Sequence, residues 1–124
     1  MLDLRCARMA DAKMTERKLR SLKPILKGAT VHVRMNPFRP PLERTAQVRA
    51  LFKRAQSLMH EMGIPLGEAA TGGGSDGNFT AALGVPTLDG LGAVGDGAHS
   101  PREHIVIQAL PERAALLAGL LATI

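Results

Sequence analysis

The chain has 124 residues, enough for one ordinary domain, and 45% hydrophobic with 22% charged residues is typical of a globular protein rather than a disordered one. There is no Trp or Tyr, and the single cysteine, Cys6, excludes an intrachain disulfide and a zinc site of the CxxC type. No apolar run reaches the roughly 20 residues that span a bilayer, and the first residues lack the apolar core of a signal peptide. We therefore expect a cytoplasmic protein that does not contact membranes.

The charge is distributed unevenly along the chain. Residues 1–54 contain 14 Lys and Arg against 4 Asp and Glu, whereas residues 55–124 contain 2 against 7. A basic half could bind nucleic acid, but its charges are scattered through apparent helices, without the aromatic residues that stack on bases. We expect a solvated basic face with one or two arginines reserved for an anionic ligand, and no nucleic-acid partner.

Residues 1–35 show the pattern of a β-α-β unit. Two stretches of alternating apolar and polar residues, at 1–6 and 29–35, flank a strongly charged helix that is expected to stop near Pro24. One such unit cannot cover both faces of a sheet, so it looks incomplete by itself. The proline-rich link at 36–44 is then a plausible domain boundary.

The rest of the chain alternates helices with short extended segments, which is the pattern of an α/β domain. Apolar residues recur at three- and four-residue spacing through residues 45–63 and predict a helix that ends at Gly63. Another helix is predicted to begin around Pro111. Its predicted apolar face includes Ala114, Leu117, Ala118 and Leu121.

The segment TGGGSDGNFTAALG, residues 71–84, joins a glycine-rich loop to a short predicted helix that Ser75 or Asp76 can cap. Glycines ahead of a helix let backbone N–H groups approach a ligand, and a helix N-terminus favours negative charge. A flexible tether would not lead into a capped helix. A tight turn with a cap needs no ligand, so the segment is either an anion site or a structural turn.

His99 lies in GDGAHSPREH, in a loop between small residues and Pro101 that no helix can occupy. Neutral imidazole is the commonest metal-binding side chain, so this histidine could be a ligand presented by a loop. His104, five residues further, is more typical of a residue that packs beside the following strand. Zinc needs several protein ligands, and no second histidine or cysteine lies at a convincing spacing, so His99 remains open between ligand and structural residue.

Four segments lie in this order along the chain: LDLR at 2–5, RPPLE at 39–43, TGGGSDGNF at 71–79 and GAHSPREHI at 97–105. Taken together they resemble the C-terminal third of the zinc-dependent exopeptidases and deacylases, which include glutamate carboxypeptidase, acetylornithine deacetylase and succinyl-diaminopimelate desuccinylase. Each of the four segments is weak evidence by itself, but GGGSDGN followed some twenty residues later by GAHSPxE is specific. The resemblance covers essentially the whole chain.

The resemblance implies an α/β fold in two parts. Residues 1–36 would be the last β-α-β of a lid and dimerisation domain, and residues 37–124 the C-terminal part of a catalytic domain. His99 matches the last zinc ligand of a family site that holds two zinc ions. Arg5 and Arg39 match basic positions that face the substrate carboxylate or the reacting carbonyl. The residues that match the loop lining the substrate pocket are Gly73, Gly74, Ser75, Asp76 and Asn78.

The other zinc ligands and the general base of that family would lie upstream of residue 1. We therefore expect a fragment of a zinc-dependent metallopeptidase or amidohydrolase that is homodimeric when complete and inactive as 124 residues. The complete enzyme would hydrolyse an amide bond next to a free carboxylate in a peptide or N-acyl amino acid. The alternative is a non-catalytic remnant or assembly module. For Arg39, the alternative role is packing beside Pro40 and Pro41.

Overall fold

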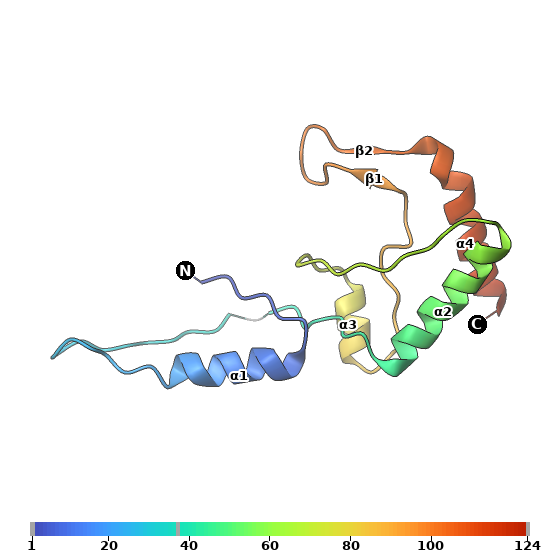
Figure 1. The fold of residues 1–124 in the computed structure, drawn as a ribbon. Coiled ribbons are helices and arrows are strands. Elements are labelled where there is room, and N and C mark those ends of the chain that lie inside the picture. Colours follow the sequence, from blue (N-terminus) through green and yellow to red (C-terminus); the bar gives the residue numbers. More distant parts are fainter. Residues whose placement is uncertain (1, 37, 124) are drawn as a thin grey trace. The chain divides into compact units, whose positions relative to one another are not determined.

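The computed structural model describes residues 2–36 and 38–123, which contain helices α1 to α4, a 3-10 helix η1 and the strand pair β1–β2 (Figure 1). The chain divides into two compact units. Unit 1 comprises Met1–Arg44 with Ala70–Thr87, and unit 2 comprises Thr45–Ala69 with Leu88–Ile124. No helix in the described ranges has the length and apolarity to cross a membrane. The predicted boundary at residue 36 separates two domains of the complete family protein, which the two units do not test, so it stays a prediction.

Helix α1 (Met9–Arg20) of unit 1 is the predicted charged helix, and it contains no fully buried residue. The Arg8 guanidinium donates hydrogen bonds of 2.9 and 3.1 Å to the carboxylate of Asp11 in the first turn. This hydrogen bond raises the pKa of Arg8, which stays charged. The helix ends ahead of Pro24 because Ser21 turns back, its hydroxyl donating to a carbonyl of the last turn at 2.8 Å.

The two strands predicted on either side of α1 are not formed in the described residues. Residues 2–8 and 29–36 lie outside helices and strands, and Figure 1 draws them as plain coil (dark blue and cyan). A strand needs a neighbour that pairs with its N–H and C=O groups, and no ladder reaches these segments within the described chain. Leu2 and Val31, which are apolar residues of these two alternating segments, are 69% and 43% exposed. The sequence has the alternating pattern of a strand in both segments, but neither segment pairs with another strand in the described residues.

Helices α2 (Ala46–Glu61) and α4 (Leu110–Thr123) pack against each other and form the core of unit 2. The prediction for α2 is confirmed, because the Thr45 hydroxyl accepts the first-turn N–H of Val48 at 3.2 Å and Gly63 follows the helix in the left-handed region, with φ 71°. The buried cluster between the two helices consists of Ala55, Met59, Leu116 and Leu120.

The apolar face predicted for α4 is wrong. Leu116 and Leu120 are the buried residues, at 0% and 4% exposure. The residues of the predicted face, Ala114, Leu117, Ala118 and Leu121, are all exposed. Leucine and alanine occupy nearly every side of this helix, so spacing alone fits more than one face, and the contact with α2 selects between them. That contact is close, since a Cβ at Gly119 would lie 3.2 Å from Leu58 of α2.

Strands β1 (Gly95–Asp96) and β2 (His104–Ile105) form an antiparallel hairpin in unit 2, and η1 (Ile107–Ala109) connects it to α4 (Figure 1). Gly95 pairs with Ile105, and a Cβ at Gly95 would collide with the carbonyl of the neighbouring His104, so glycine is needed there. Arg113 of α4 donates to the carbonyls of the preceding turn, at residues 90 and 92, over 2.5 and 2.8 Å. These bonds tie the hairpin's entry to the core helix.

Candidate functional site

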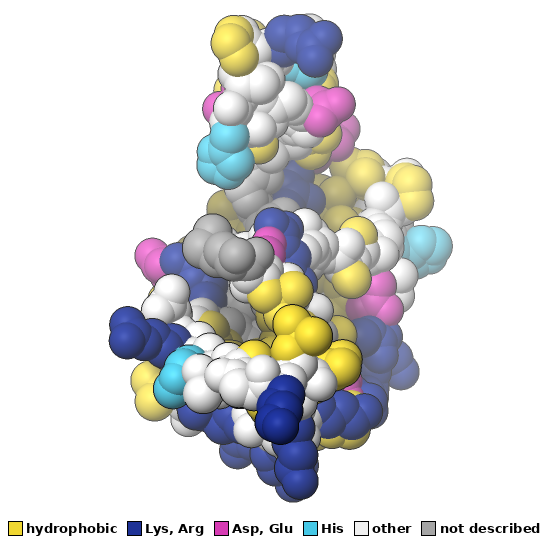
Figure 2. Space-filling model, turned by 90° about the vertical axis from the view of Figure 1, so that its left-hand side faces the viewer, with side chains coloured by type: hydrophobic (Ala, Val, Ile, Leu, Met, Phe, Trp, Pro, Cys, Tyr) yellow, Lys and Arg dark blue, Asp and Glu magenta, His cyan; other side chains and the backbone are white. Residues whose placement is uncertain are grey.

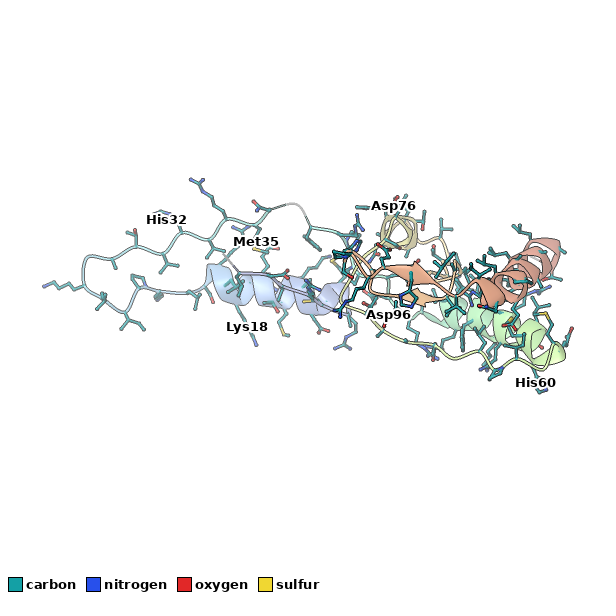
Figure 3. All side chains as sticks on the ribbon, turned by 90° about the horizontal axis from the view of Figure 1, so that it is seen from above. Lys18, His32, Met35, His60, Asp76 and Asp96 are labelled. Atoms are coloured by element: carbon teal, nitrogen blue, oxygen red, sulfur yellow. The ribbon has the colours of Figure 1, made fainter. Side chains whose placement is uncertain are left out.

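The predicted site residues fall in both compact units. Arg5, Arg39 and residues 73–78 belong to unit 1, whereas His99 belongs to the β1–β2 loop of unit 2. In unit 1 the glycine-rich loop leads into the short helix α3 (Gly77–Ala82), and Asp76 stands at the start of that helix (Figure 3).

The side chains of both predicted arginines lie against the glycine-rich loop. A Cβ added at Gly72 would lie 3.0 Å from Cδ of Arg5, and a Cβ added at Gly74 would lie 2.6 Å from Cδ of Arg39. Arg5 also donates from Nη1 to the Gly72 carbonyl at 3.3 Å. A larger residue at either glycine would push the arginine away. The loop therefore brings together two residues that lie far apart in the sequence, and its glycines make room for their side chains.

The two arginines differ in how firmly other side chains hold them. Arg5 forms a close ion pair with Asp3, with nitrogen–oxygen distances of 3.0 and 3.1 Å. Arg39 lies at 4.0 Å from the Asp76 carboxylate and has its guanidinium carbon 5.3 Å from the ring centre of Phe79. An ion pair this long between exposed groups contributes little, while an exposed cation–π contact contributes about 0.5–1 kcal/mol. Among these side-chain contacts, the Phe79 ring thus holds Arg39 more firmly than the long ion pair with Asp76 does.

The start of α3 is capped by Ser75 and not by Asp76. The Ser75 hydroxyl accepts the Gly77 N–H at 3.2 Å, whereas the Asp76 side chain makes no capping hydrogen bond. The Asp76 carboxylate is fully exposed at the helix start, where its negative charge opposes the attraction of the helix dipole for another anion. Recognition of an anion by this loop would therefore depend on the arginines.

Asn78 matches a pocket-lining position of the resemblance, but its amide is used inside unit 1. The residue is 8% exposed and is the one buried polar or charged residue among those described. Its Nδ2 donates to the Pro40 carbonyl at 2.7 Å, and its Oδ1 accepts the Ser75 N–H at 2.8 Å. By contrast, Gly73 is exposed and only donates its N–H to the Thr71 hydroxyl at 3.2 Å.

His99 is exposed and has φ 65°, the one positive φ of a non-glycine residue in the described chain. This conformation costs roughly 1–3 kcal/mol, and such residues cluster at functional sites. A tight turn holds it. Ser100 donates to the Gly97 carbonyl from its N–H at 3.0 Å and its hydroxyl at 2.7 Å, while the Glu103 carboxylate accepts the His99 N–H at 3.3 Å. The loop thus presents the imidazole at the cost of backbone strain.

The described residues do not form a complete metal site. Nowhere among them do three or more His, Cys, Asp or Glu side chains come together in a way that could hold a metal ion. A zinc site uses three or four protein ligands, so His99 fits as one ligand only. His104 lies in β2, is exposed, and has its Nδ1 2.9 Å from the Arg102 carbonyl.

A hollow beside α2 contains none of the predicted site residues. One of the residues that line it is His60, which is labelled in Figure 3. The sequence HEMGI at this histidine begins like a zinc-protease helix, but Ile64 stands where the second histidine would be. The lining residues are Lys53, Gln56, Ser57, His60, Ile64, Pro65 and Leu66.

Several residues that shape the two loops were not singled out from the sequence. Gly72 and Phe79 contact the arginines, and Ser100 and Glu103 build the turn that carries His99. The motifs contained a signal for them, because each lies inside or directly beside a segment that was already selected. Nothing in the sequence marked Arg113, which reaches its partners across more than twenty residues.

Unit 1 thus contains two arginines that lie against a glycine-rich loop, and unit 2 contains a histidine held at positive φ by a tight turn. Residues 10–123 match the peptidase family M20/M25/M40 over nearly the whole chain, and the chain belongs to this family. It is 34% identical over 123 residues to carboxypeptidase G2 from Pseudomonas sp. (strain RS-16). That alignment covers 96% of this chain and 30% of the relative, so the chain spans less than a third of the relative's length. No solved structure matches it.

Proposed function

We propose that the chain is the carboxylate-recognising segment of a zinc-dependent exopeptidase or deacylase that hydrolyses an amide bond next to a free carboxylate. The observation on which this proposal rests is that the side chains of Arg5 and Arg39 both lie against one glycine-rich loop. Membership of a peptidase family and similarity to a carboxypeptidase support it. The substrate class is a peptide or an N-acyl amino acid.

Arg39 is the arginine better placed to bind the substrate carboxylate. Its guanidinium lies 4.0 Å from the Asp76 carboxylate and over the Phe79 ring, a contact that does not use its N–H groups. A planar guanidinium can give a carboxylate two parallel hydrogen bonds, which lysine cannot reproduce. Arg5, already paired with Asp3, would add positive charge on the same loop. The two together favour a ligand with a free carboxylate over its amide.

His99 would supply one zinc ligand. The remaining ligands and the general base would come from the part of a full-length family member that the 124 residues do not match. Zinc, when bound, supplies an activated water at neutral pH. The contribution of this chain is to hold the imidazole in one orientation through the turn at residues 97–103. The described residues alone do not complete the site, so we expect no hydrolysis by the 124-residue chain.

A second candidate function is a non-catalytic assembly module. The observation that favours it is the apolar surface of unit 1, where Leu22, Ile25 and Leu26 are 56%, 100% and 75% exposed. A homodimer of the complete protein remains an expectation under both functions. The genomic sequence ahead of residue 1 distinguishes them. An in-frame His-x-Asp motif followed by a Glu-Glu pair supports the enzyme, and an unrelated sequence supports the module.

The direct test replaces Arg39 with lysine in a chimera in which this chain substitutes for the matching segment of carboxypeptidase G2. We expect kcat/KM for substrates with a free carboxylate to fall by roughly tenfold to a few hundredfold, or about 1.4–3 kcal/mol of transition-state stabilisation. Amidated substrates and zinc content should be little affected. His99→Ala should instead lose metal and activity on every substrate. Equal losses on free and amidated substrates after Arg39→Lys would leave Arg39 a packing residue.

A further inference from the structure

The backbone that carries Arg39 is attached to the glycine-rich loop through a single buried amide. Pro40 directly follows Arg39, and its carbonyl accepts the 2.7 Å hydrogen bond from Nδ2 of Asn78. The same amide accepts the Ser75 N–H at 2.8 Å, so one side chain binds both segments. The two segments are 38 residues apart along the chain. Pro40 and Pro41 have no N–H to donate, which leaves the carbonyl as the group through which this stretch can be held.

Asn78 and its neighbours surround Arg39 on more than one side. Phe79, the next residue of α3, lies under the guanidinium at 5.3 Å, and the Arg39 stem crosses the backbone of Gly74. Asn78 fixes the backbone at one end of the arginine and Phe79 orients the other. An arginine has four rotatable side-chain bonds, so a displaced backbone would move the guanidinium away from both the ring and the loop.

The burial of Asn78 argues against direct contact with a ligand. At 8% exposure its oxygen is occupied by Ser75 and its nitrogen by Pro40. A buried side chain with satisfied hydrogen bonds is costly to disturb. A substrate that took either hydrogen bond would leave a backbone group unpaired.

We propose that Asn78 is a positioning residue, which holds Arg39 over the glycine-rich loop so that the guanidinium is preorganised for a carboxylate. This inference rests in part on the proposed function, because it assigns a ligand to Arg39. Its structural half, the hydrogen bond from Asn78 to the Pro40 carbonyl next to Arg39, does not depend on any ligand. The two halves can therefore be tested separately.

The first experiment needs no ligand and uses the intact chain labelled with ¹⁵N and ¹³C. A scalar coupling across the hydrogen bond should join Nδ2 of Asn78 to the carbonyl carbon of Pro40, and its absence would overturn the proposal. Asn78→Asp keeps an oxygen for the Ser75 N–H and loses the donor to Pro40. The Nε–H of Arg39 should become as mobile in this variant as that of the exposed Arg102. Asn36→Asp makes the same chemical change at an exposed position and should leave Arg39 unchanged.

The second experiment measures carboxylate binding with N-acetylglycine, and with N-acetylglycinamide as the neutral control. We expect Asn78→Asp to raise the Kd for N-acetylglycine about tenfold, and Asn36→Asp to change it less than twofold. The double variant with Arg39→Lys should bind no more weakly than Arg39→Lys alone, because residues that act through one another are not additive. Additive losses, or an unchanged Kd in Asn78→Asp, would overturn the positioning role.

Failure of the proposed function gives a different pattern. If the wild-type chain does not distinguish N-acetylglycine from its amide, carboxylate recognition is wrong, while the Nε–H mobility of Arg39 still decides whether Asn78 holds it. If Asn78→Asp does not fold, Asn78→Ser takes its place, since serine is uncharged and its side chain is too short to replace both hydrogen bonds. An Arg39 side chain that keeps its wild-type order in a folded Asn78 variant overturns the inference.

Discussion

The two compact units are stabilised by different kinds of interaction. Among the described residues of unit 2 the buried ones are all apolar, and they lie on the two helices α2 and α4. In the described part of unit 1 the single buried residue is Asn78, and side chain to backbone hydrogen bonds connect its segments. One of these is the 2.8 Å bond from the Met9 N–H to the Glu43 carboxylate, which ties α1 to the proline-rich link.

This difference has consequences for function. Apolar burial is non-directional and tolerates small shifts, whereas a hydrogen bond is lost when its partners move or turn. Unit 1 therefore fixes the orientation of its arginines with few contacts and has little core to resist disturbance. Figure 2 shows Lys and Arg side chains (dark blue) around exposed apolar ones (yellow). Ile25 of unit 1 is 100% exposed.

The largest effect is expected in the core of unit 2. Leu116→Ala removes a side chain that is 0% exposed and should lower the free energy of unfolding by about 2–5 kcal/mol. Leu117→Ala is the matched control, because the neighbouring leucine is 39% exposed and should cost under about 1 kcal/mol. Urea unfolding followed by circular dichroism measures both. A larger loss for Leu117→Ala than for Leu116→Ala would mean that α4 packs with the face predicted from its sequence, and equal losses would contradict the burial of Leu116 alone.

The same variant tests whether the two units are independent. Amide hydrogen exchange of Ser75 reports on unit 1, because its N–H is bound to Asn78. We expect Leu116→Ala to accelerate exchange throughout α2 and α4 and to leave Ser75 protected. If the exchange of the Ser75 amide accelerated by the same factor, the two units would unfold together. Their different kinds of interaction would then not give them separate stabilities.

The turn that carries His99 should be the next most sensitive place. Gly97 has φ 71°, and an added Cβ would lie 2.8 Å from the Arg102 carbonyl. Gly97→Ala should therefore destabilise the hairpin by about 1–3 kcal/mol through strain and collision. Gly67→Ala is the control, because Gly67 has no positive φ and no atom within 4 Å of its would-be Cβ. Chemical shifts of β1 and β2 that remained unchanged in Gly97→Ala would contradict this.

A smaller effect separates the strain at His99 from its imidazole. His99→Gly and His99→Ala both remove the ring, but only glycine adopts φ 65° without a steric cost. The glycine variant should be more stable than the alanine variant by about 1 kcal/mol. Thermal unfolding of the hairpin resonances measures the difference. A more stable alanine variant would show that the residue is not strained in solution.

The smallest effect concerns the exposed carboxylate beside Arg39. Asp76→Asn removes a charge 4.0 Å from the guanidinium and should leave stability unchanged, since the pair is exposed. It should strengthen binding of N-acetylglycine by about two- to threefold at low salt, and less in 0.5 M NaCl, where exposed charges are screened. Weaker binding in Asp76→Asn would mean that Asp76 orients Arg39 and does not compete with the ligand.

The sequence predicted the helices better than their surroundings. The strong periodicity of residues 46–61 and the glycine after it defined α2, and Ser75 was a correct capping candidate. The face of α4 could not be chosen because leucines lie on several sides of it. The strands flanking α1 were predicted from alternation, which shows that a segment could pair but does not supply a partner.

The site residues were selected by motif, and their geometry was not predictable from it. Asparagine is usually exposed, so nothing indicated that Asn78 would be buried between Ser75 and Pro40. The contacts of Gly72 with Arg5 and of Gly74 with Arg39 join segments about 35 to 67 residues apart, which sequence spacing does not reveal. The positive φ of His99 depends on the whole turn around Ser100.

The ring of Phe79 under Arg39 also makes this position visible to spectroscopy. An aromatic ring shifts the resonances of protons above its face, and the guanidinium carbon of Arg39 lies 5.3 Å from the ring centre. The sequence has no Trp or Tyr, 3 Phe and 4 His, so few other aromatic rings can produce such a shift. The Arg39 side-chain protons should therefore resonate upfield of those of the other arginines. Any ligand that draws the guanidinium off the ring would move them back, so the chain contains its own reporter of occupancy.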